Sequence, residues 1–533
     1  METEKSFFAL LKQVAVIETH GQDVKVRRVE YDSRKVCPGA VFCALSGLHT
    51  NGEKYISAAI KNGAAAVVYE HTAPEFIEGI CYAKVENARL AMSRIAAALY
   101  EYPSTKLGII GVTGTEGKSS TVSFIWQLLN ELHYKTGYFS TVSYSYGNRS
   151  EEQKNPEHQT TPESTTVQER LAAMLQNGCR YAVVESSSHG LSALTARLAD
   201  VAFDAGVFMN VTEEHLEFHK TFERYRSDKA NLFRKLDEHD HKKNGTFFPS
   251  FGVVNMDDPS APYFCQATKK TVFGFSTDAT VVSSPVTQYL TSFLLATNIR
   301  ESGTAITCRV HVFERGTDGV LHETNASDVR IPLAGAFNVK NVLASMITVS
   351  QLTGTPLEKV AAALPALKPI TGRMFSVDEG QNFTVLIDYA HTPSSFETIM
   401  PSISETVHRD GKKLIALFGS GGERDTAKRP EQGRVASKYC DIIILADEDP
   451  RGEDSYELLN MIAAGIQGKR KGENLFIIPD RKAAIRKAFS LCEAGDTVLL
   501  LGKGHENSII FRDCVMPYDE ETEARIALRE MQN

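Results

Sequence analysis

The sequence predicts an α/β protein of two to four domains, and three observations lead to that prediction. The chain has 533 residues, which is too long for a single hydrophobic core. Short apolar segments alternate with amphipathic helical segments, as they do in sheets joined by crossover helices. Polar or glycine-rich loops directly follow several of the apolar segments, and in parallel sheets ligands bind beyond the carboxyl ends of the strands.

The composition excludes several classes of protein. With 42% hydrophobic and 23% charged residues, the chain has the make-up of a soluble globular protein. Its net charge of −8 and pI near 6.1, without a long basic run, argue against nucleic acid and membranes as partners. The nine cysteines form no C-x-x-C pair, which indicates reduced thiols. Since the first residues make a poor signal peptide and no apolar run has the length of a membrane span, we expect a cytoplasmic enzyme.

Residues 1–105 are expected to form a small α/β domain. VFCAL (41–45) is a strand candidate. YISAAIKNGAAAVVY (55–69) predicts an amphipathic helix that stops at Gly63 and is followed by a strand. The sequence Tyr-Pro-Ser at 102–104 is typical of a linker, so we place a domain boundary directly after it.

The next segment carries a candidate phosphate-binding loop, GVTGTEGKSS (111–120), between an apolar strand and a helix that starts at Lys118. It departs from the common G-x-x-x-x-G-K-[ST] pattern, because the first glycine is replaced and the turn moves to Gly114. A glycine turn, a helix N-terminus, a lysine and a hydroxyl at Ser119 still meet the physical needs of phosphate binding. A plain strand-to-helix turn is the alternative. Glu116 is unexpected, because a carboxylate repels phosphate unless it points away.

Two further polar side chains follow apolar strands. Glu185 closes YAVVE (181–185), and His215 follows FDAGVFMN (203–210). If these strands and the strand before Lys118 are neighbours, the three side chains converge on one edge, where Glu185 and His215 can bind or orient a metal ion near phosphates. Taken separately, each is more simply a solvated strand end or a residue near a helix cap.

Two other features predict no site from the residues alone. HLEFH (215–219) lacks the H-E-x-x-H spacing of zinc proteases, so zinc is not expected. Lys229 lies in a helical segment, YRSDKANLF, where a lone lysine is usually solvated.

The second half of the chain predicts two kinds of sheet. Residues 270–335 hold short strands rich in Thr, Val and Ser, which we interpret as an antiparallel addition to the central domain. Residues 383–501 hold five apolar strands separated by helices, which predicts a second α/β domain with a binding face formed by its loops. The loops after these strands carry side chains of both charges, which suit a zwitterionic ligand or a phosphate plus an amine. For any single charged residue, a surface salt bridge is an adequate explanation. These loops are DYAHTP, GSGGERD, DEDPRGED, PDR and GKGHE, and their charged residues include Asp425, Lys428, Arg429, Lys503 and His505.

These motifs resemble those of the Mur ligase family over nearly the whole chain. TGTEGKSS resembles that family's T-G-T-x-G-K-[ST]-[ST] loop, which accounts for the displaced glycine. The likeness is greatest to the members that add the third residue of the peptide. The other matching segments, in the family's order, are DSR (32–34), PGAVFCALSG, QTTPES, ESSSHGL, NVTEEHLEFH, AGAFNVKN, GRM, DYAHTP, GSGGERD, KRP, DPRGED and GKGHE.

The resemblance implies three domains and a reaction. The domains are a UDP-sugar-binding domain at 1–105, a central ATP-binding P-loop domain at 106–370 and a C-terminal Rossmann-like domain that binds the amino acid at 371–533. The implied substrates are UDP-N-acetylmuramoyl-L-alanyl-D-glutamate, ATP and a free diamino acid, with Mg²⁺ as cofactor. ATP converts the D-glutamate carboxylate into an acyl phosphate, the amine attacks, and an amide forms as phosphate leaves. We expect a monomer.

The resemblance also implies a role for each matching position. The catalytic set is Lys118, Glu185, His215 and Lys229, and the Mg²⁺ set is Ser119, Glu185, His215 and a carbamoylated Lys229. ATP contacts fall on Gly114, Thr115, Gly117, Lys118, Ser119, Ser120, Asn338, Arg373, Asp388 and His391. UDP-muramoyl contacts fall on Ser33, Thr160, Thr161, Ser187 and Arg197, although Arg197 stands two residues later than the family's arginine usually does. Contacts to the amino acid fall on Arg424, Glu448, Asp449, Arg451, Gly502 and Glu506.

Three departures from the family pattern bear on function. Glu116 stands where the family usually has Asn, and Phe375 replaces the Glu of G-R-M-E. EDPR (448–451) has Asp449 where enzymes that use meso-diaminopimelate typically have the Asn of D-N-P-R. Because an extra carboxylate disfavours a distal carboxylate, we hypothesise that L-lysine or L-ornithine is preferred over meso-diaminopimelate.

Three alternatives remain open from the sequence. One is a related ligase such as folylpolyglutamate synthetase, although the UDP-type N-terminal domain argues against it. Another is a catalytically impaired nucleotide-binding scaffold on the same fold, which Glu116 and Phe375 favour. The third is a simple P-loop ATPase or kinase, which leaves the C-terminal loops unexplained.

Overall fold

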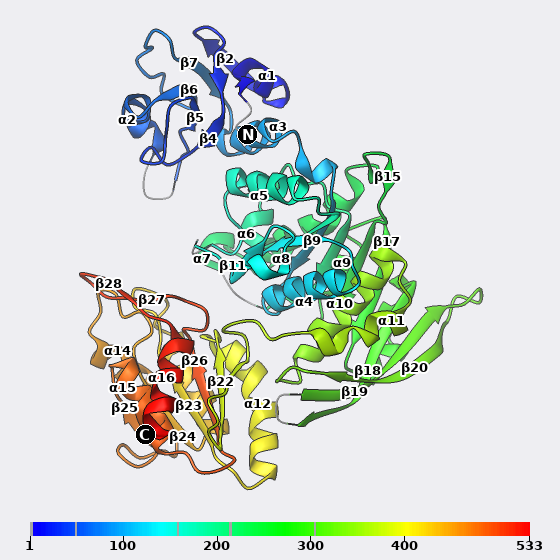
Figure 1. Cartoon of the computed structure of the whole chain (residues 1–533), viewed down its shortest axis with the longest axis vertical. Coiled ribbons are helices and arrows are strands. Elements are labelled where there is room, and N and C mark those ends of the chain that lie inside the picture. The colour runs from blue at the N-terminus through cyan, green and yellow to red at the C-terminus, as the bar shows by residue number, and fades with distance from the viewer. Residues whose placement is uncertain (1–3, 48–50, 157–158, 213–215, 303–304, 533) are drawn as a thin grey trace. The chain divides into compact units, whose positions relative to one another are not determined.

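The computed structural model describes the chain except residues 1–3, 48–50, 157–158, 213–215, 303–304 and 533 (Figure 1). It is a mixed α/β structure with three large sheets of five, eleven and six strands. Its contacts divide the chain into two compact units. One comprises Met1–Leu295, Val312–Asn325 and Val342–Ala361, and the other comprises Ala296–His311, Ala326–Asn341 and Ala362–Asn533. The predicted α/β fold class is confirmed.

The N-terminal sheet has the strand order β2-β7-β6-β5-β4, with β2 antiparallel to β7 and the other strands parallel. Alternate strand residues face opposite sides: Val41 and Val68 pack with α1 and α3, and Phe42 and Val67 pack with α2. The predicted strand at 41–45 and the helix and strand at 55–69 are confirmed. The elements are β2 (Val16–His20), β4 (Arg28–Glu30), β5 (Ala40–Cys43), β6 (Ala64–Tyr69), β7 (Cys81–Val85), α1 (Phe7–Leu10), α2 (Ile56–Lys61) and α3 (Ala88–Leu99).

The central sheet has the order β11-β10-β9-β12-β8-β13-β16-β17-β18-β19-β20. From β9 to β18 all neighbours are parallel. The chain leaves β8 towards β9 and β12 on one side and later passes to β13 and β16 on the other. The strand order therefore reverses at β8, and such a switch point is where ligands bind. The strands are β8 (Gly108–Thr113), β9 (Thr136–Phe139), β10 (Ser143–Ser145), β11 (Gln153–Lys154), β12 (Tyr181–Glu185), β13 (Ala205–Phe208), β16 (Phe251–Asn255) and β17 (Thr271–Ser276).

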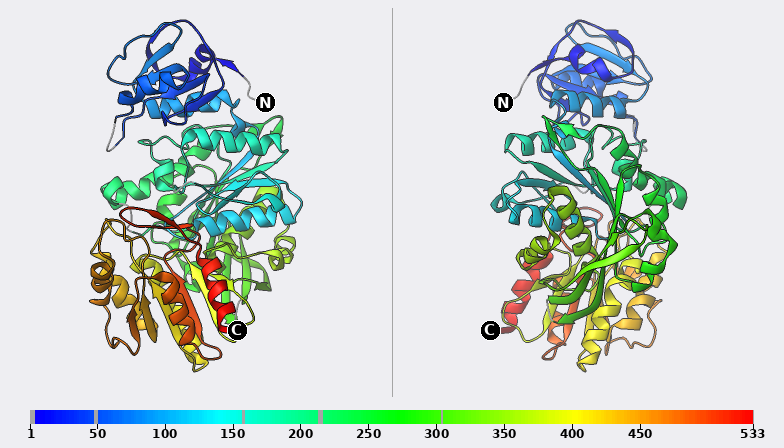
Figure 2. Two further views of the ribbon diagram at one scale, coloured as in Figure 1. Left: turned by 60° about the vertical axis from the view of Figure 1, so that its left-hand side comes forward. Right: turned by 90° about the vertical axis from the view of Figure 1, so that its right-hand side faces the viewer.

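Helices cover both faces of the parallel part of this sheet, as Figures 1 and 2 show. One face packs on α5 (Ser164–Gln176), α8 (Phe222–Arg234) and α9 (Ala261–Cys265). On the other, α4 (Lys118–Glu131) packs against β9 and β12. Short α6 (Ser188–Leu191) and α7 (Leu216–His219) follow β12 and β13, and α10 (Asn338–Thr353) and α11 (Leu357–Ala362) follow the last strand.

The predicted antiparallel addition forms the edge of the central sheet. It consists of β18 (Ser292–Ser302), β19 (Ala305–Arg315) and β20 (Leu321–Ile331), which are eleven residues each and so longer than the short strands expected. Arg309 contacts Asp328, and Thr324 donates to the carbonyl of Val312. Along β19 the residue numbers of these contacts rise, while those of their partners in β20 fall, so the two strands are antiparallel.

The C-terminal sheet is doubly wound, in the order β21-β22-β26-β23-β24-β25, and only β21 is antiparallel. Alternate residues again face two cores, one with α12, α13 and α14 and one with α15 and α16. The five predicted apolar strands are confirmed. The elements are β21 (Phe375–Val377), β22 (Thr384–Asp388), β23 (Leu414–Phe418), β24 (Ile442–Leu445), β25 (Leu475–Ile477), β26 (Thr497–Leu501), α12 (Pro393–Arg409), α13 (Lys428–Tyr439), α14 (Ser455–Ala463), α15 (Arg481–Ser490) and α16 (Glu520–Gln532).

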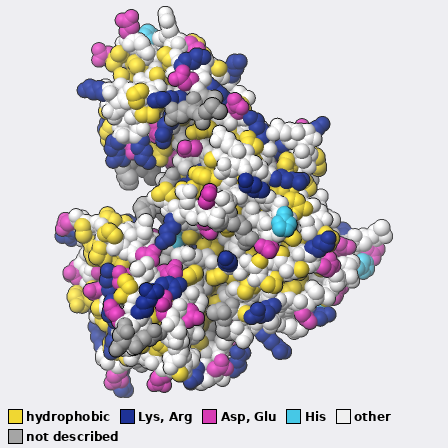
Figure 3. Space-filling view, in the orientation of Figure 1, with side chains coloured by type: hydrophobic (Ala, Val, Ile, Leu, Met, Phe, Trp, Pro, Cys, Tyr) yellow, Lys and Arg dark blue, Asp and Glu magenta, His cyan; other side chains and the backbone are white. Residues whose placement is uncertain are grey.

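The surface carries both signs of charge. In the face shown by Figure 3, lysine and arginine side chains are interspersed with aspartate and glutamate. Among the described residues, no helix combines the length and apolar character needed to cross a bilayer.

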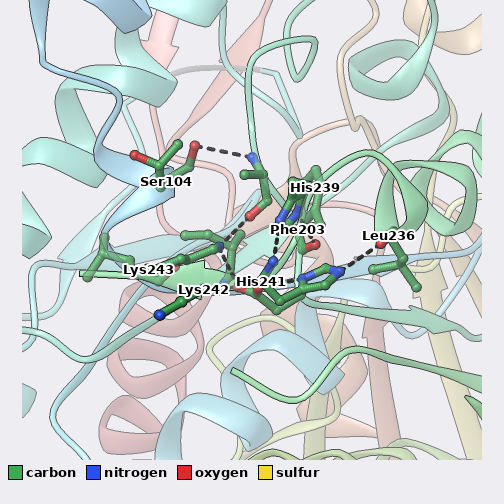
Figure 4. A network of polar contacts seen from close by, with 12 residues as sticks. Ser104, Phe203, Leu236, His239, His241, Lys242 and Lys243 are labelled. Carbon is green, nitrogen blue, oxygen red and sulfur yellow. Dashed lines mark hydrogen bonds and ion pairs between the residues drawn. The ribbon is translucent and has the colours of Figure 1, made fainter. Parts of the chain in front are cut away.

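A buried ionic network closes the amino end of the central sheet (Figure 4). The Lys243 ammonium donates to Asp204 at 2.5 Å and to the carbonyls of Leu107 and Ala202 at 2.9 and 2.8 Å. His241 contacts the other oxygen of Asp204 at 2.9 Å. Burial lowers the pKa of Lys243, and Asp204 opposes that shift.

The same network contains three groups able to bind a metal, since ligand atoms of Asp204, His239 and His241 lie within 4.8 Å of one another. However, Nε2 of His239 and Nε2 of His241 already contact the carbonyls of Phe203 and Leu236. The ammonium of Lys243 supplies the positive charge beside the carboxylate. We therefore interpret Asp204 and Lys243 as a structural ion pair. It holds the β14–β15 hairpin (Lys242–Lys243 and Thr246–Phe247) against the sheet.

We predict that Asp204→Asn destabilises the protein by about 3 to 5 kcal/mol, because it leaves the buried ammonium of Lys243 without a counter-charge. The midpoint of thermal unfolding measures this. His239→Gln is the matched control, since it changes a half-buried member of the same network that carries no ion pair to Asp204, and it should cost much less. Equal losses for both variants would contradict this account.

Candidate active site

The phosphate-binding loop lies at the switch point of the central sheet. It follows β8, and α4 begins directly after Gly117, which caps the helix with φ of +80°. A side chain at this φ would be strained, so glycine is required there. The loop therefore ends in free N–H groups at a helix N-terminus, an arrangement that binds phosphate. The Lys118 ammonium donates to the carbonyl of Thr115 at 2.7 Å within the loop.

Asn210 holds the phosphate-binding loop in shape, and the sequence analysis missed it. Its side-chain oxygen accepts from the N–H groups of Thr115 at 3.0 Å and Glu116 at 2.8 Å. Its amide nitrogen donates to the carbonyl of Glu116 at 3.3 Å. Asn210 follows β13, which is a neighbour of β8. Its single side chain therefore fixes the backbone turn at Gly114, Thr115 and Glu116.

Glu185 lies next to the loop, as expected for the end of β12. Its carboxylate accepts from the hydroxyl of Ser119, with both oxygens at 3.0 Å. It also accepts from the backbone N–H of Thr141 at 2.7 Å and from its hydroxyl at 3.1 Å. Thr141 is a second residue that the sequence analysis missed. The structure thus brings Lys118, Ser119 and Glu185 together; the third predicted group, His215, lies outside the described residues.

Lys229 is buried, and the expectation of a solvated lysine was wrong. Only 2% of the residue is exposed, and the ammonium donates to the carbonyl of Gly114 at 2.6 Å. It also lies 4.5 Å from the centre of the Tyr225 ring, whose hydroxyl contacts Thr115 at 3.1 Å. Helix α8 therefore places Lys229 in contact with the phosphate-binding loop.

A cavity of about 250 Å³ opens beside these groups in the same compact unit. Thr161 is buried and follows the lining residue Thr160; it donates to the carbonyl of Glu185 at 2.8 Å and accepts from the hydroxyl of Ser187 at 3.0 Å. Arg197 contacts the carboxylate of Glu163 at 2.8 Å and donates to the carbonyl of Thr161 at 2.9 Å. The cavity is lined by Lys118, Gln159, Thr160, Ser187, Ser188, His189, Arg197, Tyr225 and Lys229.

Two further predicted residues lie in different settings. Ser120 is buried in the first turn of α4. Ser33 follows β4 of the N-terminal sheet, and its carbonyl accepts from the side chain of Asn62 at 2.8 Å.

The remaining predicted ATP contacts belong to the second compact unit. Asp388 ends β22 and accepts from the N–H groups of Met374 and Ala390, both at 2.8 Å. Burial raises the pKa of this carboxyl, and Arg373 and the two N–H donors oppose the shift. The Arg373 guanidinium lies 5.0 Å from the ring of Tyr389. His391 contacts the carbonyl of Tyr389 at 2.9 Å, and Asn338 donates to the carbonyl of Ala334 at 2.7 Å.

The residues predicted to hold the amino acid form a cluster of charges at the ends of β24 and β26. The fully buried Lys503 ammonium donates to Asp449 at 2.9 Å and to Glu506 at 2.6 Å. The same Asp449 oxygen accepts from the N–H of Ile510 at 3.0 Å. Buried Oε2 of Glu448 and buried Nε of Arg451 have no hydrogen-bond partner among the described residues.

Other residues of this face differ in role. Gly502 has φ of +99°, and an added Cβ there would lie 2.7 Å from Oε2 of Glu448. Arg424 is exposed. The buried guanidinium of Arg429 forms a double contact with Glu453 at 2.7 and 2.8 Å, so for this residue the salt-bridge alternative holds. Phe375 packs against the core of the C-terminal sheet, so the replaced Glu position serves packing here.

Comparison with known families assigns the chain. Residues 112–349 match the Mur ligase middle domain, residues 372–504 the Mur ligase glutamate ligase domain, and residues 25–102 the catalytic domain of the Mur ligase family. A UDP-N-acetylmuramyl-tripeptide synthetase of Treponema denticola is 56% identical over 98% of both chains. The chain belongs to the Mur ligase family. Another synthetase of that name, from Treponema pallidum, is 50% identical over 98% of this chain and 97% of its own.

Solved structures agree with this assignment. The structure of a UDP-N-acetylmuramoyl-L-alanyl-D-glutamate–2,6-diaminopimelate ligase matches all of both chains with a TM-score of 0.62 and 26% identity. A MurF ligase of Thermotoga maritima in complex with ADP matches 95% of this chain and 97% of its own with a TM-score of 0.58, and at 20% identity it shows the fold alone. This Mur ligase is an ATP-dependent peptide ligase of peptidoglycan biosynthesis.

In this Mur ligase, we predict that Asn210→Ala weakens ATP binding about tenfold, or by about 1.4 kcal/mol, because the loop loses the side chain that fixes its backbone N–H groups. Isothermal titration with ATP measures the dissociation constant. Asn130→Ala is the matched control: Asn130 also makes several side-chain hydrogen bonds, but near the far end of α4. A similar loss for both variants would argue that the effect comes from general destabilisation.

Proposed function

We propose that the enzyme joins a diamino acid to the D-glutamate of UDP-N-acetylmuramoyl-L-alanyl-D-glutamate in the cytoplasm, through an acyl phosphate. One observation supports this proposal above the others. Lys118, Ser119 and Glu185 lie together at the switch point, and the cavity beside them is lined by Thr160, Ser187 and Arg197. The relatives at 56% and 50% identity are UDP-N-acetylmuramyl-tripeptide synthetases, which supports the tripeptide-forming reaction over folylpolyglutamate synthesis.

The geometry suits phosphoryl transfer to a carboxylate. The N-terminus of α4 and the Lys118 ammonium would neutralise the phosphates of ATP, since such a reaction is catalysed mainly by positioning and charge. Arg197 lines the cavity and would hold an anionic substrate group, with Glu163 fixing its orientation. The buried groups and small volume of the cavity would limit water, which hydrolyses acyl phosphates.

The donor set beside the loop fits Mg²⁺. The Ser119 hydroxyl and the Glu185 carboxylate are hard oxygen ligands at a phosphate site, as this ion prefers. His215 and a carbamoylated Lys229 are proposed to complete the set, and the ion would neutralise charge on the transferred phosphate. Lys229 lines the cavity, so carbon dioxide can reach its amine.

We also propose three domains, at 1–105, 106–370 and 371–533, and a monomeric enzyme. The matched segments at 25–102, 112–349 and 372–504 support these boundaries. Retention of Lys118, Glu185 and Lys229 favours a working ligase over an impaired scaffold. The charged C-terminal loops favour it over a simple ATPase.

The charge of the C-terminal cluster favours a cationic amino acid. Apart from exposed Arg424, the cluster has three acids, Glu448, Asp449 and Glu506, against two bases, Arg451 and Lys503. Asp449 does not act as an isolated negative charge, because Lys503 contacts it. With Arg424 the acids and bases balance, so the preference rests on the one excess acid among the buried and half-buried members, which favours a distal ammonium. We therefore propose L-lysine or L-ornithine over meso-diaminopimelate.

The direct test is phosphate release from ATP with UDP-N-acetylmuramoyl-L-alanyl-D-glutamate and each of L-lysine, L-ornithine and meso-diaminopimelate. We expect release with one of the first two amino acids and a product heavier by that amino acid less water. Omission of the muramoyl substrate is the control. ATP binding without release in every reaction would contradict a ligase of this type and favour a scaffold.

Asp449→Asn tests the charge argument. Asparagine can still accept from Ile510 and Lys503, but the cluster loses its excess negative charge. We predict that the ratio of kcat/KM for meso-diaminopimelate to that for lysine rises about tenfold, a change of about 1.4 kcal/mol. Competition assays measure the ratio. Asp378→Asn, at an exposed position before β22, is the control and should leave it unchanged. An unchanged ratio in the Asp449 variant would remove the basis for this preference.

A further inference from the structure

A buried Asp–His–Ser chain lies against the cavity, and neither ATP binding nor the metal set accounts for it. His219 is fully buried at the end of α7. Its Nδ1 lies 2.9 Å from the carboxylate of Asp228, and its Nε2 lies 3.0 Å from the hydroxyl of Ser188. Ser188 begins α6 and lines the cavity together with Lys118 and Lys229.

The partners of His219 fix where its proton lies. An ionised carboxylate only accepts, so Nδ1 carries the proton that faces Asp228. In the neutral ring Nε2 is then an acceptor, and the Ser188 hydroxyl donates to it. The remaining lone pairs of the serine oxygen are free to accept a proton from a group in the cavity, which Ser188 lines. The order of donors therefore runs from the cavity through Ser188 to His219.

Other groups around the ring do not alter this order. The rings of His189 and Tyr225 lie 5.2 and 5.0 Å from that of His219, in tilted or edge-on contact. Both ring nitrogens of His219 already have partners, Nδ1 in Asp228 and Nε2 in Ser188, so these two rings contribute aromatic packing. Asp228 is the only acid that the described residues place in contact with this ring.

We propose that this chain removes the proton of the attacking amine during ligation, with Ser188 as the catalytic contact and His219 as the proton acceptor behind it. The proposal rests on the proposed ligase function. The neutral amine forms the new N–C bond to the acyl phosphate carbon. Its proton passes to the Ser188 oxygen as the serine proton passes to Nε2 of His219. The C–O bond to phosphate then breaks, and phosphate leaves with the electron pair. Asp228 stabilises the imidazolium that results.

The chain also has a plain structural role, since it ties α6, α7 and α8 together, and the experiment must separate the two. Acyl phosphate formation does not need the amine, whereas amide formation does. Hydroxylamine traps acyl phosphates as hydroxamates without needing a base, so it reports the first step. A lost tether would impair both steps, but a lost proton acceptor would impair only the second.

We expect His219→Gln to lower the rate of amide formation with the diamino acid about 10²-fold or more. Hydroxamate formation with ATP, muramoyl dipeptide and hydroxylamine should stay within about twofold of wild type. Asp228→Asn should behave in the same way, because its amide would donate to Nδ1 and leave a proton on Nε2 that blocks transfer from Ser188. This variant keeps the tether and changes the tautomer only.

His239→Gln, a histidine in the Asp204 network, is the matched control and should leave both rates unchanged. Equal losses of hydroxamate and amide in the His219 and Asp228 variants, or no loss of amide, would overturn the relay. If the wild-type enzyme formed neither product, the proposed function itself would fail, and that result is distinct from failure of the relay.

Discussion

The reversal of strand order at β8 is the constraint on which the site depends. In a parallel sheet the loops beyond neighbouring strands normally cover one another with crossover helices, but at a reversal the helices diverge and leave a crevice. Here the loop after β8, the end of β12 and the residue after β13 meet in that crevice. Lys118, Glu185 and Asn210 therefore come together although almost a hundred residues separate the first from the last.

Buried charged side chains serve two purposes in this structure, and their surroundings show which ones stabilise the fold and which ones belong to a candidate site. Lys243 is buried and donates to three acceptors within the network, so it serves the fold. Lys503 contacts both Asp449 and Glu506. It stabilises a cluster in which Glu448 and Arg451 still have polar atoms without a partner in the described part of the chain. Unsatisfied buried atoms are costly, so a cluster that keeps them is suited to a ligand that supplies the missing partners.

The sequence predicts the strands well, because buried parallel strands are short apolar runs bounded by polar loops. It also predicts the phosphate-binding loop, whose residues are contiguous. It does not predict Asn210, Thr141 or the burial of Lys229. Each acts on a partner between 44 and 115 residues away, and nothing in its own segment differs from an ordinary loop or helix. The charge of Asp449 is visible in the sequence, but its pairing with Lys503 is not, since that depends on β24 and β26 ending at the same edge.

The contrast between Lys229 and Lys243 shows how the same fold can keep one amine inert and leave another available. Both are buried to within 3% exposure, and both are donors to backbone carbonyls. The Lys243 ammonium donates to three acceptors, one of which is the carboxylate of Asp204. Its deprotonation would therefore break the ion pair. Lys229 contacts the carbonyl of Gly114 in the very loop that binds phosphate, and it lines the cavity. A change of charge at Lys229 would therefore act on the loop that we propose to bind the phosphates of ATP. Helix α8 carries this lysine, and so it links the charge of one side chain to that loop.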